Sequence, residues 1–374
     1  MGHQCNMRAT SQPFHKAIPF ALLLLLLILP GCGSSSSGGP PPPPPPPTFT
    51  TIDAPGAGTG KFQGTVAITV NAGGDVAGPF IDSNMNSHGF VRSAAGTITT
   101  FDAPGAGTQA NQGTLVTAIN ASGTIAGSYI DQKFGFHGFL RTQGGTFTIF
   151  DVPNSQGTLL LGLNDSGATT GSFLDLSGDH GFLRASDGTL TTFDIPNQAG
   201  SVSAPSRINA SGTIAGFFFD INSVLHGFLR APDGTLTTFD APGAGTAPQD
   251  GTFANGINAG GLVVGSVRGS GVRHSYLRAT DNTYTTFDPP GAGPAGSSAN
   301  SINDSGAIVG TYTDANGAIH GYLRNPDGTF TTIDDPNEVI GTNSGTSVSN
   351  INASGVIVGR FEDSAQAQHG FVRK

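Results

Sequence analysis

The chain repeats one pattern seven times, and this repetition limits its possible folds more than any other feature. His-Gly-[Phe/Tyr]-[Leu/Val]-Arg occurs six times, and a seventh copy has Ser275 in place of the glycine. Asp-x-Pro and Asn-x-x-Gly-x-x-x-Gly also occur seven times each, in the same order. A period of 43 to 49 residues between histidines is typical of β-propellers, in which each repeat forms one blade. The repeated histidines are His88, His137, His180, His226, His274, His320 and His369.

One copy divides into four short strands. The segments 115–120 and 124–130 are apolar or β-branched, and Asn120–Gly123 forms a tight turn between them. The segments 137–141 and 146–151 are joined by a second glycine-containing turn. Each copy is therefore predicted to be an antiparallel meander, and the longer loop after Asp-x-Pro leads to the next blade.

Composition agrees with an all-β fold. The chain has 57 glycines and 25 prolines among 374 residues, which disfavours long helices. Its net charge is −9 and it contains no basic block, so a nucleic-acid partner is not expected. The two cysteines, Cys5 and Cys32, both precede the repeats, which excludes a disulfide framework in the body.

The two ends of the repeat region complement each other. The last copy ends at Lys374 without a fourth strand, whereas residues 48–53 resemble a fourth strand without the other three. We therefore predict that these segments pair. The resulting fold is a seven-bladed β-propeller of four-stranded antiparallel blades, residues 48–374, closed by pairing the N-terminal strand with the last three C-terminal strands. We expect a monomer.

Residues 1–31 resemble a signal peptide. Arg8 and Lys16 precede an unbroken apolar run, Ala21–Leu29, that is too short to span a bilayer. The following Leu-Pro-Gly-Cys sequence resembles a bacterial lipobox, which predicts that Cys32 is lipidated. Residues 32–47 then form a Gly/Ser and polyproline linker. We expect an exported lipoprotein, membrane-anchored on the periplasmic or cell-surface side, or, with Cys32 unmodified, a secreted protein.

The whole repeat pattern over residues 48–374 resembles the extracellular repeat family named after its His-Ala-Phe tripeptide (HAF repeats). Here the tripeptide is His-Gly-[Phe/Tyr] in six copies and His-Ser-Tyr in one. The resemblance implies a secreted or surface protein of undetermined activity.

The repeated polar residues favour a structural interpretation. Seven histidines on seven blades are too far apart to bind one metal ion, because neighbouring sheets pack about 10 Å apart. We expect His, Arg and the Asp of Asp-x-Pro to form one buried network in each blade. The second glycine of each Asn-x-x-Gly-x-x-x-Gly motif, such as Gly171, is predicted to let adjacent sheets approach closely. Five Asn-x-Ser sequons fall in the strand-one turns and are interpreted as turns rather than glycosylation sites.

Aspartates also gather at one predicted rim. Six copies place an aspartate four residues after the second glycine, and with those of Asp-x-Pro they make 13 of the 25 acidic residues. They cap strand ends, or they form an acidic surface for Ca²⁺ or a cationic partner. The six are Asp82, Asp131, Asp175, Asp220, Asp314 and Asp363.

Residues that break the repeat are the candidate ligand-binding positions. The fifth copy has Gly269 instead of the aspartate and carries Arg268 and Arg273 in the same loop. The fourth copy has three consecutive phenylalanines around Phe218, and Arg207 stands where other copies have small or polar residues. These positions mark either a specific site grafted on the scaffold or drift at tolerant positions.

We therefore predict a binding or scaffold module whose ligand, a protein or a polysaccharide, meets the rim of variable loops. The alternative is a carbohydrate-active hydrolase or lyase at the axial channel, which needs at least two perturbed carboxylates in one pocket. A spacer or adhesin is a third possibility. No catalytic residue, metal ligand or cofactor is assigned. The lining of the axial cavity distinguishes these functions.

Overall fold

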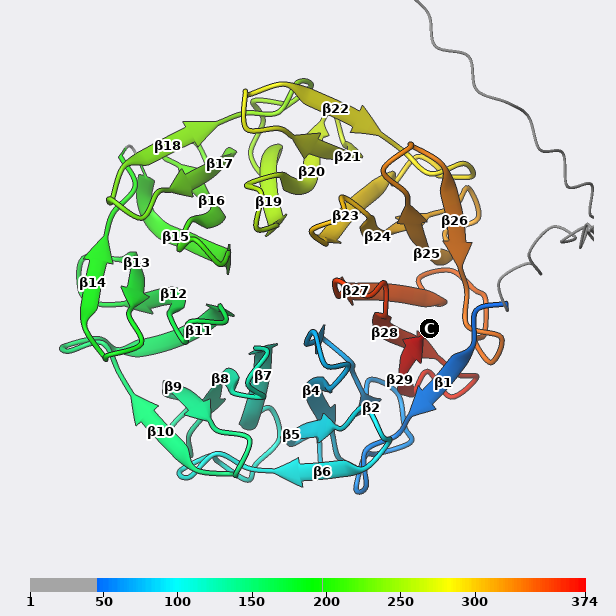
Figure 1. Cartoon of the computed structure of the whole chain (residues 1–374), viewed down its shortest axis with the longest axis horizontal. Coiled ribbons are helices and arrows are strands. Elements are labelled where there is room, and N and C mark those ends of the chain that lie inside the picture. Colours follow the sequence, from blue (N-terminus) through cyan, green and yellow to red (C-terminus); the bar gives the residue numbers. More distant parts are fainter. Residues whose placement is uncertain (1–45, 197) are drawn as a thin grey trace, which may run out of the picture. The chain divides into compact units, whose positions relative to one another are not determined.

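The computed structural model describes residues 46–196 and 198–374, without the side chains of 198–203. Every regular element in this part is a β-strand, and the strands are grouped around a central axis (Figure 1). The chain divides after Pro46. The predicted signal peptide, Cys32 and most of the linker therefore lie outside the described residues. Within them, we find no helix that could cross a bilayer.

Neighbouring strands form four-stranded antiparallel groups, here called blades. In the blade β7–β10 the strands pair in sequence order, from the axis outwards. Its strands are β7 (Gly113–Ile119), β8 (Ile125–Ile130), β9 (Phe136–Arg141) and β10 (Phe147–Phe150). Four further blades repeat this order: β11 (Gly157–Leu163), β12 (Thr169–Leu174), β13 (Asp179–Arg184), β14 (Leu190–Phe193); β15 (Gln198–Ile208), β16 (Ile214–Asp220), β17 (Leu225–Arg230), β18 (Leu236–Phe239); β19 (Gly251–Ile257), β20 (Val263–Gly269), β21 (Val272–Arg278), β22 (Tyr284–Phe287); β23 (Ser297–Ile302), β24 (Ile308–Thr313), β25 (Ile319–Arg324), β26 (Phe330–Ile333).

The two ends of the repeat region meet in one blade. Strand β1 (Phe49–Ile52) pairs antiparallel with β29, so that Phe49 lies opposite Arg373 and Ile52 opposite Gly370. This blade contains β27 (Thr346–Ile351), β28 (Ile357–Glu362) and β29 (Gln368–Arg373). The next blade begins with the short strands β2 (Gly64–Thr65) and β3 (Thr69–Val70), followed by β4 (Val76–Ile81), β5 (Ser87–Arg92) and β6 (Ile98–Phe101). The N-terminal strand thus has the partner expected from the sequence.

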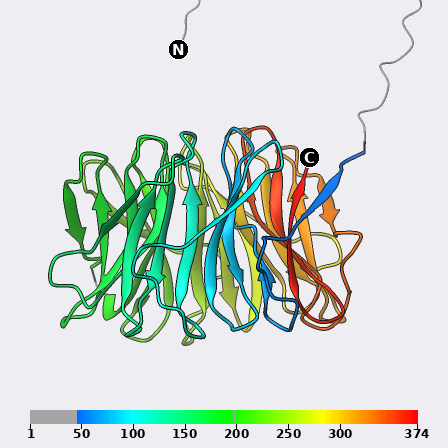
Figure 2. The same cartoon turned by 90° about the horizontal axis from the view of Figure 1, so that it is seen from below.

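The strands run between two different rims (Figure 2). The tight-turn rim holds the Asn-x-x-Gly turns and the turns between the third and fourth strands of each blade. The variable-loop rim holds the loops between the second and third strands and the loops that lead to the next blade. Thr48 and Lys374 exchange backbone hydrogen bonds at 2.9 and 3.1 Å. Both residues adjoin the ends of β1 and β29 that lie at the tight-turn rim.

Seven asparagines link the blades around the axis. The Nδ2 of each one donates to the backbone carbonyl of the next, at 2.9 to 3.2 Å, and the last, Asn352, donates to Asn71. Each Oδ1 accepts the backbone N–H four residues later. The side chains are buried, which accords with interpreting their sequons as turns. They are Asn71, Asn120, Asn164, Asn209, Asn258, Asn303 and Asn352.

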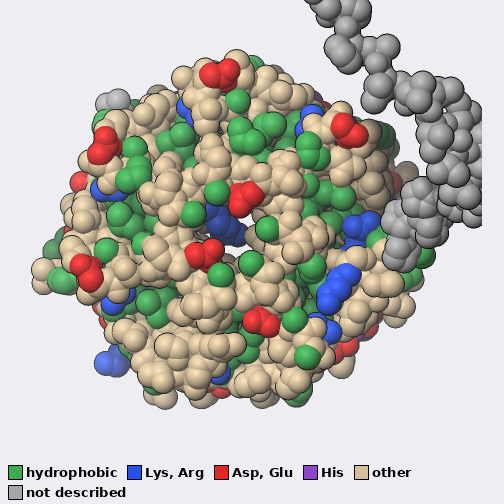
Figure 3. All heavy atoms as spheres, in the orientation of Figure 1, with side chains coloured by type: hydrophobic (Ala, Val, Ile, Leu, Met, Phe, Trp, Pro, Cys, Tyr) green, Lys and Arg blue, Asp and Glu red, His purple; other side chains and the backbone are tan. Residues whose placement is uncertain are grey.

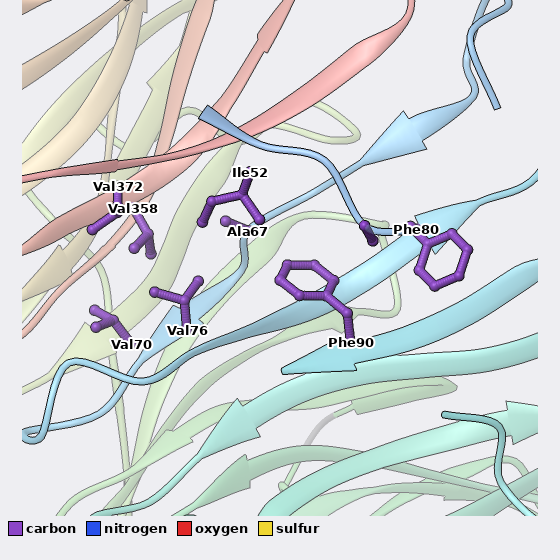
Figure 4. Close-up of a cluster of buried hydrophobic side chains, with 9 residues drawn as sticks. Ile52, Ala67, Val70, Val76, Phe80, Phe90, Val358 and Val372 are labelled. Atoms are coloured by element: carbon purple, nitrogen blue, oxygen red, sulfur yellow. The ribbon is translucent and has the colours of Figure 1, made fainter. Parts of the chain in front are cut away.

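The core lies between neighbouring blades. Figure 4 shows one cluster, in which Ile52 of β1 and Val358 and Val372 of β28 and β29 pack with Phe80 and Phe90 of the next blade. The third strand of every blade contributes one aromatic ring with 0% exposure. These rings are Phe90, Phe139, Phe182, Phe228, Tyr276, Tyr322 and Phe371. Their burial supplies the apolar contacts on which a chain without disulfides in this region depends.

The second glycine of each Asn-x-x-Gly-x-x-x-Gly motif was predicted to let adjacent sheets approach, and this reason was wrong. A Cβ added at Gly171 would overlap the carbonyl oxygen of Leu159 and come within 3.0 Å of the Phe182 ring. Both residues belong to the same blade as Gly171. The glycine is required because β12 approaches its own neighbours closely, at a bulge between Leu160 and Gly162.

Candidate functional site

Each repeated histidine is held by the aspartate that follows its own fourth strand. The Nδ1–H of His88 donates to Asp102 at 2.9 Å, and the other six copies make the same contact. In the last blade the aspartate comes from the other end of the chain, since His369 bonds to Asp53 at 2.7 Å. The His–Asp part of the predicted network is therefore present, although the histidine side chains keep 13 to 46% of their exposure.

A second aspartate faces the same histidine in six blades. Asp131 lies 3.5 Å from Nε2 of His137, and its Oδ1 also accepts the backbone N–H groups of Lys133 and Gly135. The counterparts of Asp131 cap their loops in the same way. These aspartates thus act as caps, as one of the two interpretations expected, and they also pair with the histidine.

Stacking completes this arrangement. The imidazole of His137 lies 4.9 Å from the ring of Tyr129, and five other copies have an equivalent phenylalanine or tyrosine. Burial lowers the pKa of His137, but the hydrogen bond and charge of Asp151, together with Asp131, outweigh it and raise the pKa. The Asp131 pKa is lowered, chiefly by the hydrogen bond from the Gly135 backbone.

The arginines do not join this network, which corrects the prediction. They lie at the opposite ends of the third strands, where Arg141, for example, stacks over Phe101 of the preceding blade at 4.5 Å. Arg184, Arg230, Arg278 and Arg324 make the same cation–π contact between blades. Five of the seven arginines therefore join neighbouring blades, whereas Arg373 stacks over Phe49 of its own blade. Histidine ties together the loops within one blade.

Acidic side chains are segregated to the variable-loop rim. Of the 25 acidic residues, the seven outside this rim lie in or beside tight turns: Asp75, Asp165, Asp187, Asp233, Asp281, Asp304 and Asp327. The other eighteen lie at the variable-loop ends of strands or in the loops there: Asp53, Asp82, Asp102, Asp131, Asp151, Asp175, Asp179, Asp194, Asp220, Asp240, Asp250, Asp288, Asp314, Asp334, Asp335, Glu338, Glu362 and Asp363. Among the described residues, the cations that oppose them there are Lys61, Lys133, Arg268, Arg273 and Arg360.

The same rim exposes large apolar side chains. Leu176 is 94% exposed, Ile221 82%, Ile340 61%, Phe62 60% and Phe134 56%. All five lie in variable loops. Isolated exposed apolar residues are ordinary, but the location of all five on one rim makes that rim the candidate site of interaction.

A pocket of about 350 Å³ lies between two of these loops. Phe134 and Phe136 of one blade and Leu174 and Asp179 of the next line it. Leu174 is itself 42% exposed, so apolar walls remain accessible to a partner. We call this the inter-loop pocket.

The blade β19–β22 departs from the others as its sequence suggests. Its second and third strands are joined by Ser270 and Gly271, both with positive φ, which is a two-residue hairpin turn. Arg268 and Arg273 face each other across this hairpin. Arg268 pairs with Asp250 at 3.5 Å, and Arg273 stacks over Phe253 at 5.6 Å. Without the usual second aspartate, His274 is 46% exposed.

Phe218 is not a surface residue, which corrects its assignment as a ligand contact. It is 4% exposed and packs against His226, as the repeat's aromatic residue does in other blades. The residue that breaks the repeat is its neighbour Phe217, whose ring lies 5.2 Å from Phe253. Aligning the repeats could have distinguished the two residues on alternate faces of the strand, because Phe218 aligns with Tyr129 and Phe217 aligns with Ser128.

An axial cavity of about 470 Å³ is lined by the inner strands. Arg207 is the only charged residue among the described residues that line it, and Phe217 is its only aromatic one. Figure 3 looks along the axis and shows Lys or Arg atoms inside the central opening. Arg207 thus shares a cavity with Phe217, while Arg268 and Arg273 lie beside Phe253 at the variable-loop end. The structure therefore brings two of the four candidates, Arg268 and Arg273, to the boundary of blades β15–β18 and β19–β22, whereas Arg207 lies against Leu161 of the preceding blade.

The described residues contain no group of three or more His, Cys, Asp or Glu side chains arranged to hold a metal ion. The predicted possibility of Ca²⁺ at the acidic rim thus gains no candidate site in residues 46–196 and 198–374. The carboxylates there bind backbone amides and histidines instead.

No known protein-family profile matches the chain, and no curated protein matches it. Solved structures do. Puromycin hydrolase is 14% identical with a TM-score of 0.55, covering 82% of this chain and 51% of its own. A prolyl endopeptidase structure gives 9% identity and a TM-score of 0.53, covering 80% of this chain and 46% of that one. The lectin BP39L from Burkholderia pseudomallei gives 12% and 0.43, covering 83% and 99%.

This chain spans about half the length of the puromycin hydrolase and prolyl endopeptidase chains. At such low identity the likeness concerns the fold alone. What the comparisons and the strand order establish together is an all-β fold of the β-propeller type.

Proposed function

We propose that the chain forms a closed seven-bladed propeller of four-stranded antiparallel blades. The pairing of β1 with β29 and the asparagine hydrogen bonds that return from Asn352 to Asn71 support this architecture. Pairing the two chain ends satisfies backbone groups that would otherwise be edge-exposed.

We further propose that the protein is an exported binding module whose variable-loop rim docks a basic protein surface carrying apolar side chains. The observation that carries this proposal is the coincidence, on one rim, of most acidic residues with the most exposed apolar residues. Carboxylates would attract and orient a cationic partner. The inter-loop pocket would take one apolar side chain as an anchor.

The position of Thr48, where the propeller begins, agrees with this assignment. Thr48, which follows the predicted linker, lies at the tight-turn rim, at the opposite end of the strands from the variable-loop rim. We propose that a signal peptide exports the protein, that Cys32 carries the lipid anchor, and that the repeats belong to the HAF-repeat type. Mass spectrometry of the protein extracted from membranes tests the lipidation. As a second test, a Cys32→Ser variant should be released in soluble form.

The enzymatic alternative draws no support from the axial cavity. Glycoside hydrolysis needs a pair of carboxylates about 5 to 10 Å apart, whereas no acidic residue is among the described residues that line this cavity. A binding role fits the lining better.

The docking proposal is tested with immobilised full-length protein and a peptide of lysine and leucine. The matched control peptide has glutamate in place of lysine. We expect only the basic peptide to bind, and its affinity to fall as salt screens the carboxylates. The variants Phe134→Asn and Leu176→Ser should weaken binding at least about fivefold, because each removes exposed apolar surface.

Ile149→Ser is the matched control, since Ile149 is 37% exposed but lies on the outer strand β10 rather than at the variable-loop rim. It should leave the affinity unchanged. Equal binding of both peptides, or an equal effect of Ile149→Ser, contradicts the proposed rim.

A further inference from the structure

The axial cavity has two chemically different walls. Its polar side is formed by Ser206, Asn255, Asn300, Ser347 and Ser349. The three blades that come earlier in the chain contribute the apolar residues Ile68, Val116 and Leu161, together with Thr117. Its volume of about 470 Å³ falls in the range of pockets that hold small organic molecules.

Arg207 enters this cavity without a carboxylate partner in the described part of the chain. Its Nη1 donates to the backbone carbonyls of Ser206 at 2.9 Å and Leu161 at 3.4 Å. These contacts leave further guanidinium N–H groups available, because arginine carries five donors. Burial lowers the pKa of Arg207, but a guanidinium stays protonated at neutral pH.

The position of Arg207 is exceptional among the repeats. Its counterparts are Thr69, Ala118, Gly162, Gly256, Ser301 and Asn350, all of which are small or uncharged. A bulge beside Pro205 occurs at the equivalent place in other inner strands, so the backbone does not require an arginine. The scaffold therefore tolerates a short side chain there, and the cation needs another explanation.

We propose that the axial cavity binds a small organic carboxylate, with the carboxylate paired to Arg207 and its body between the polar and apolar walls. A guanidinium matches a carboxylate in planar, bidentate geometry. The free Oδ1 atoms of Asn255 and Asn300 accept hydrogen bonds from ligand hydroxyls, because their Nδ2 groups already donate to backbone carbonyls. Phe217 supplies a ring face for an apolar or aromatic body.

Isothermal titration of the full chain tests this assignment with two carboxylates of different bodies, phenylacetate and galacturonate. Benzyl alcohol and galactose are the neutral controls, and inorganic phosphate tests for simple anion binding. We expect at least one carboxylate to bind with a Kd of about 1 mM or tighter, and its neutral counterpart to bind at least about tenfold more weakly.

Arg207→Ser is the diagnostic variant, since Ser301 occupies the same position in another blade and the variant should fold. It should weaken the carboxylate at least about tenfold. Lys374→Ser removes the same charge at an exposed position outside the cavity and should change the affinity less than about twofold. Phe217→Ser, matched by Ser128, should weaken phenylacetate more than galacturonate, because it removes the aromatic ring from the cavity lining.

The proposal is overturned if neither carboxylate binds, or if the Arg207→Ser variant binds the carboxylate equally well. It is also overturned if only phosphate binds, since that result would indicate an adventitious ion only. The outcome is separate from the docking proposal, because none of these variants changes the inter-loop pocket.

Discussion

Asn352 donates a hydrogen bond from Nδ2 to the backbone carbonyl of Asn71 at 2.9 Å, across 281 residues of sequence. The same bond joins every other pair of neighbouring blades over only 44 to 49 residues. The first and last repeats thus meet through the contact that connects all other neighbours.

We predict that Asn352→Ala lowers the free energy of unfolding by about 2 to 3 kcal/mol, since the buried amide makes several hydrogen bonds of about 1 kcal/mol each. Urea denaturation followed by circular dichroism measures this loss. Asn84→Ala, an exposed loop substitution, should change stability by less than about 0.5 kcal/mol. Equal stabilities of the two variants would contradict a structural role for the asparagine contact.

The N-terminal strand should contribute to global stability. Ile52 of β1 is 0% exposed between the first and last blades, so Ile52→Ala should cost about 2 to 4 kcal/mol. Thr51→Ala, on the exposed face of the same strand, should cost less than about 0.5 kcal/mol. A fluorescence-monitored urea transition compares them, and a neutral Ile52→Ala would show that β1 is dispensable.

Two glycines should respond in opposite ways to alanine. Gly171→Ala should destabilise by more than about 2 kcal/mol, because the new Cβ would overlap the Leu159 carbonyl. Gly144→Ala meets no atom closer than 3.9 Å and should be neutral or slightly stabilising. Thermal melts of both variants test this, and a tolerated Gly171→Ala would contradict the close approach of β11 and β12.

The stability supplied by His137 should depend on pH. Its pKa is raised in the folded protein by Asp151 and Asp131, although burial opposes this. Its contribution is therefore complete below the unfolded value near 6.5 and is lost as the pH rises through the folded value. The stability difference between the protein and His137→Gln should be larger at about pH 5 than at about pH 8. A pH-independent difference in urea midpoints would contradict an ionic interaction of His137 with Asp151 and Asp131.

Asp175 should act in the acid range. Hydrogen bonds from Ser177 lower its pKa to about 2, below the model-peptide value of 3.8. Its contribution is present above that unfolded value and is lost as the pH falls towards the folded value. Melting temperatures between about pH 5 and pH 2 should therefore fall less steeply for Asp175→Asn than for the unaltered protein. Identical slopes would show that Asp175 does not contribute.

Much of the fold was predictable because each repeat contains its own turns. Asn120–Gly123 and the Asp-x-Pro loops marked the strand ends, and the observed β7 to β10 agree with the predicted strands within two residues. The pairing of residues 48–53 with the last repeat followed from what each end lacked. The His–Asp pairs followed from fixed spacing, since each pair within a blade is separated by 14 residues.

The candidate site was less predictable because it depends on which side of a strand a residue faces. Three consecutive phenylalanines were evident, but assigning Phe218 to the ligand surface required ignoring its alignment with Tyr129. Phe253 was not selected at all, since an apolar residue in an inner strand looks like core until a neighbouring Phe217 is known to touch it.

By itself, the sequence determined the number of repeats, the strand order within each one and the positions where the repetition is broken, because turns and strand alternation are local properties. The tertiary structure decided which of those exceptional residues share a space. Arg207 and Phe217 line one cavity, and Phe134 and Leu174 line another, because side chains from different strands or blades meet only after the sheets pack around the axis.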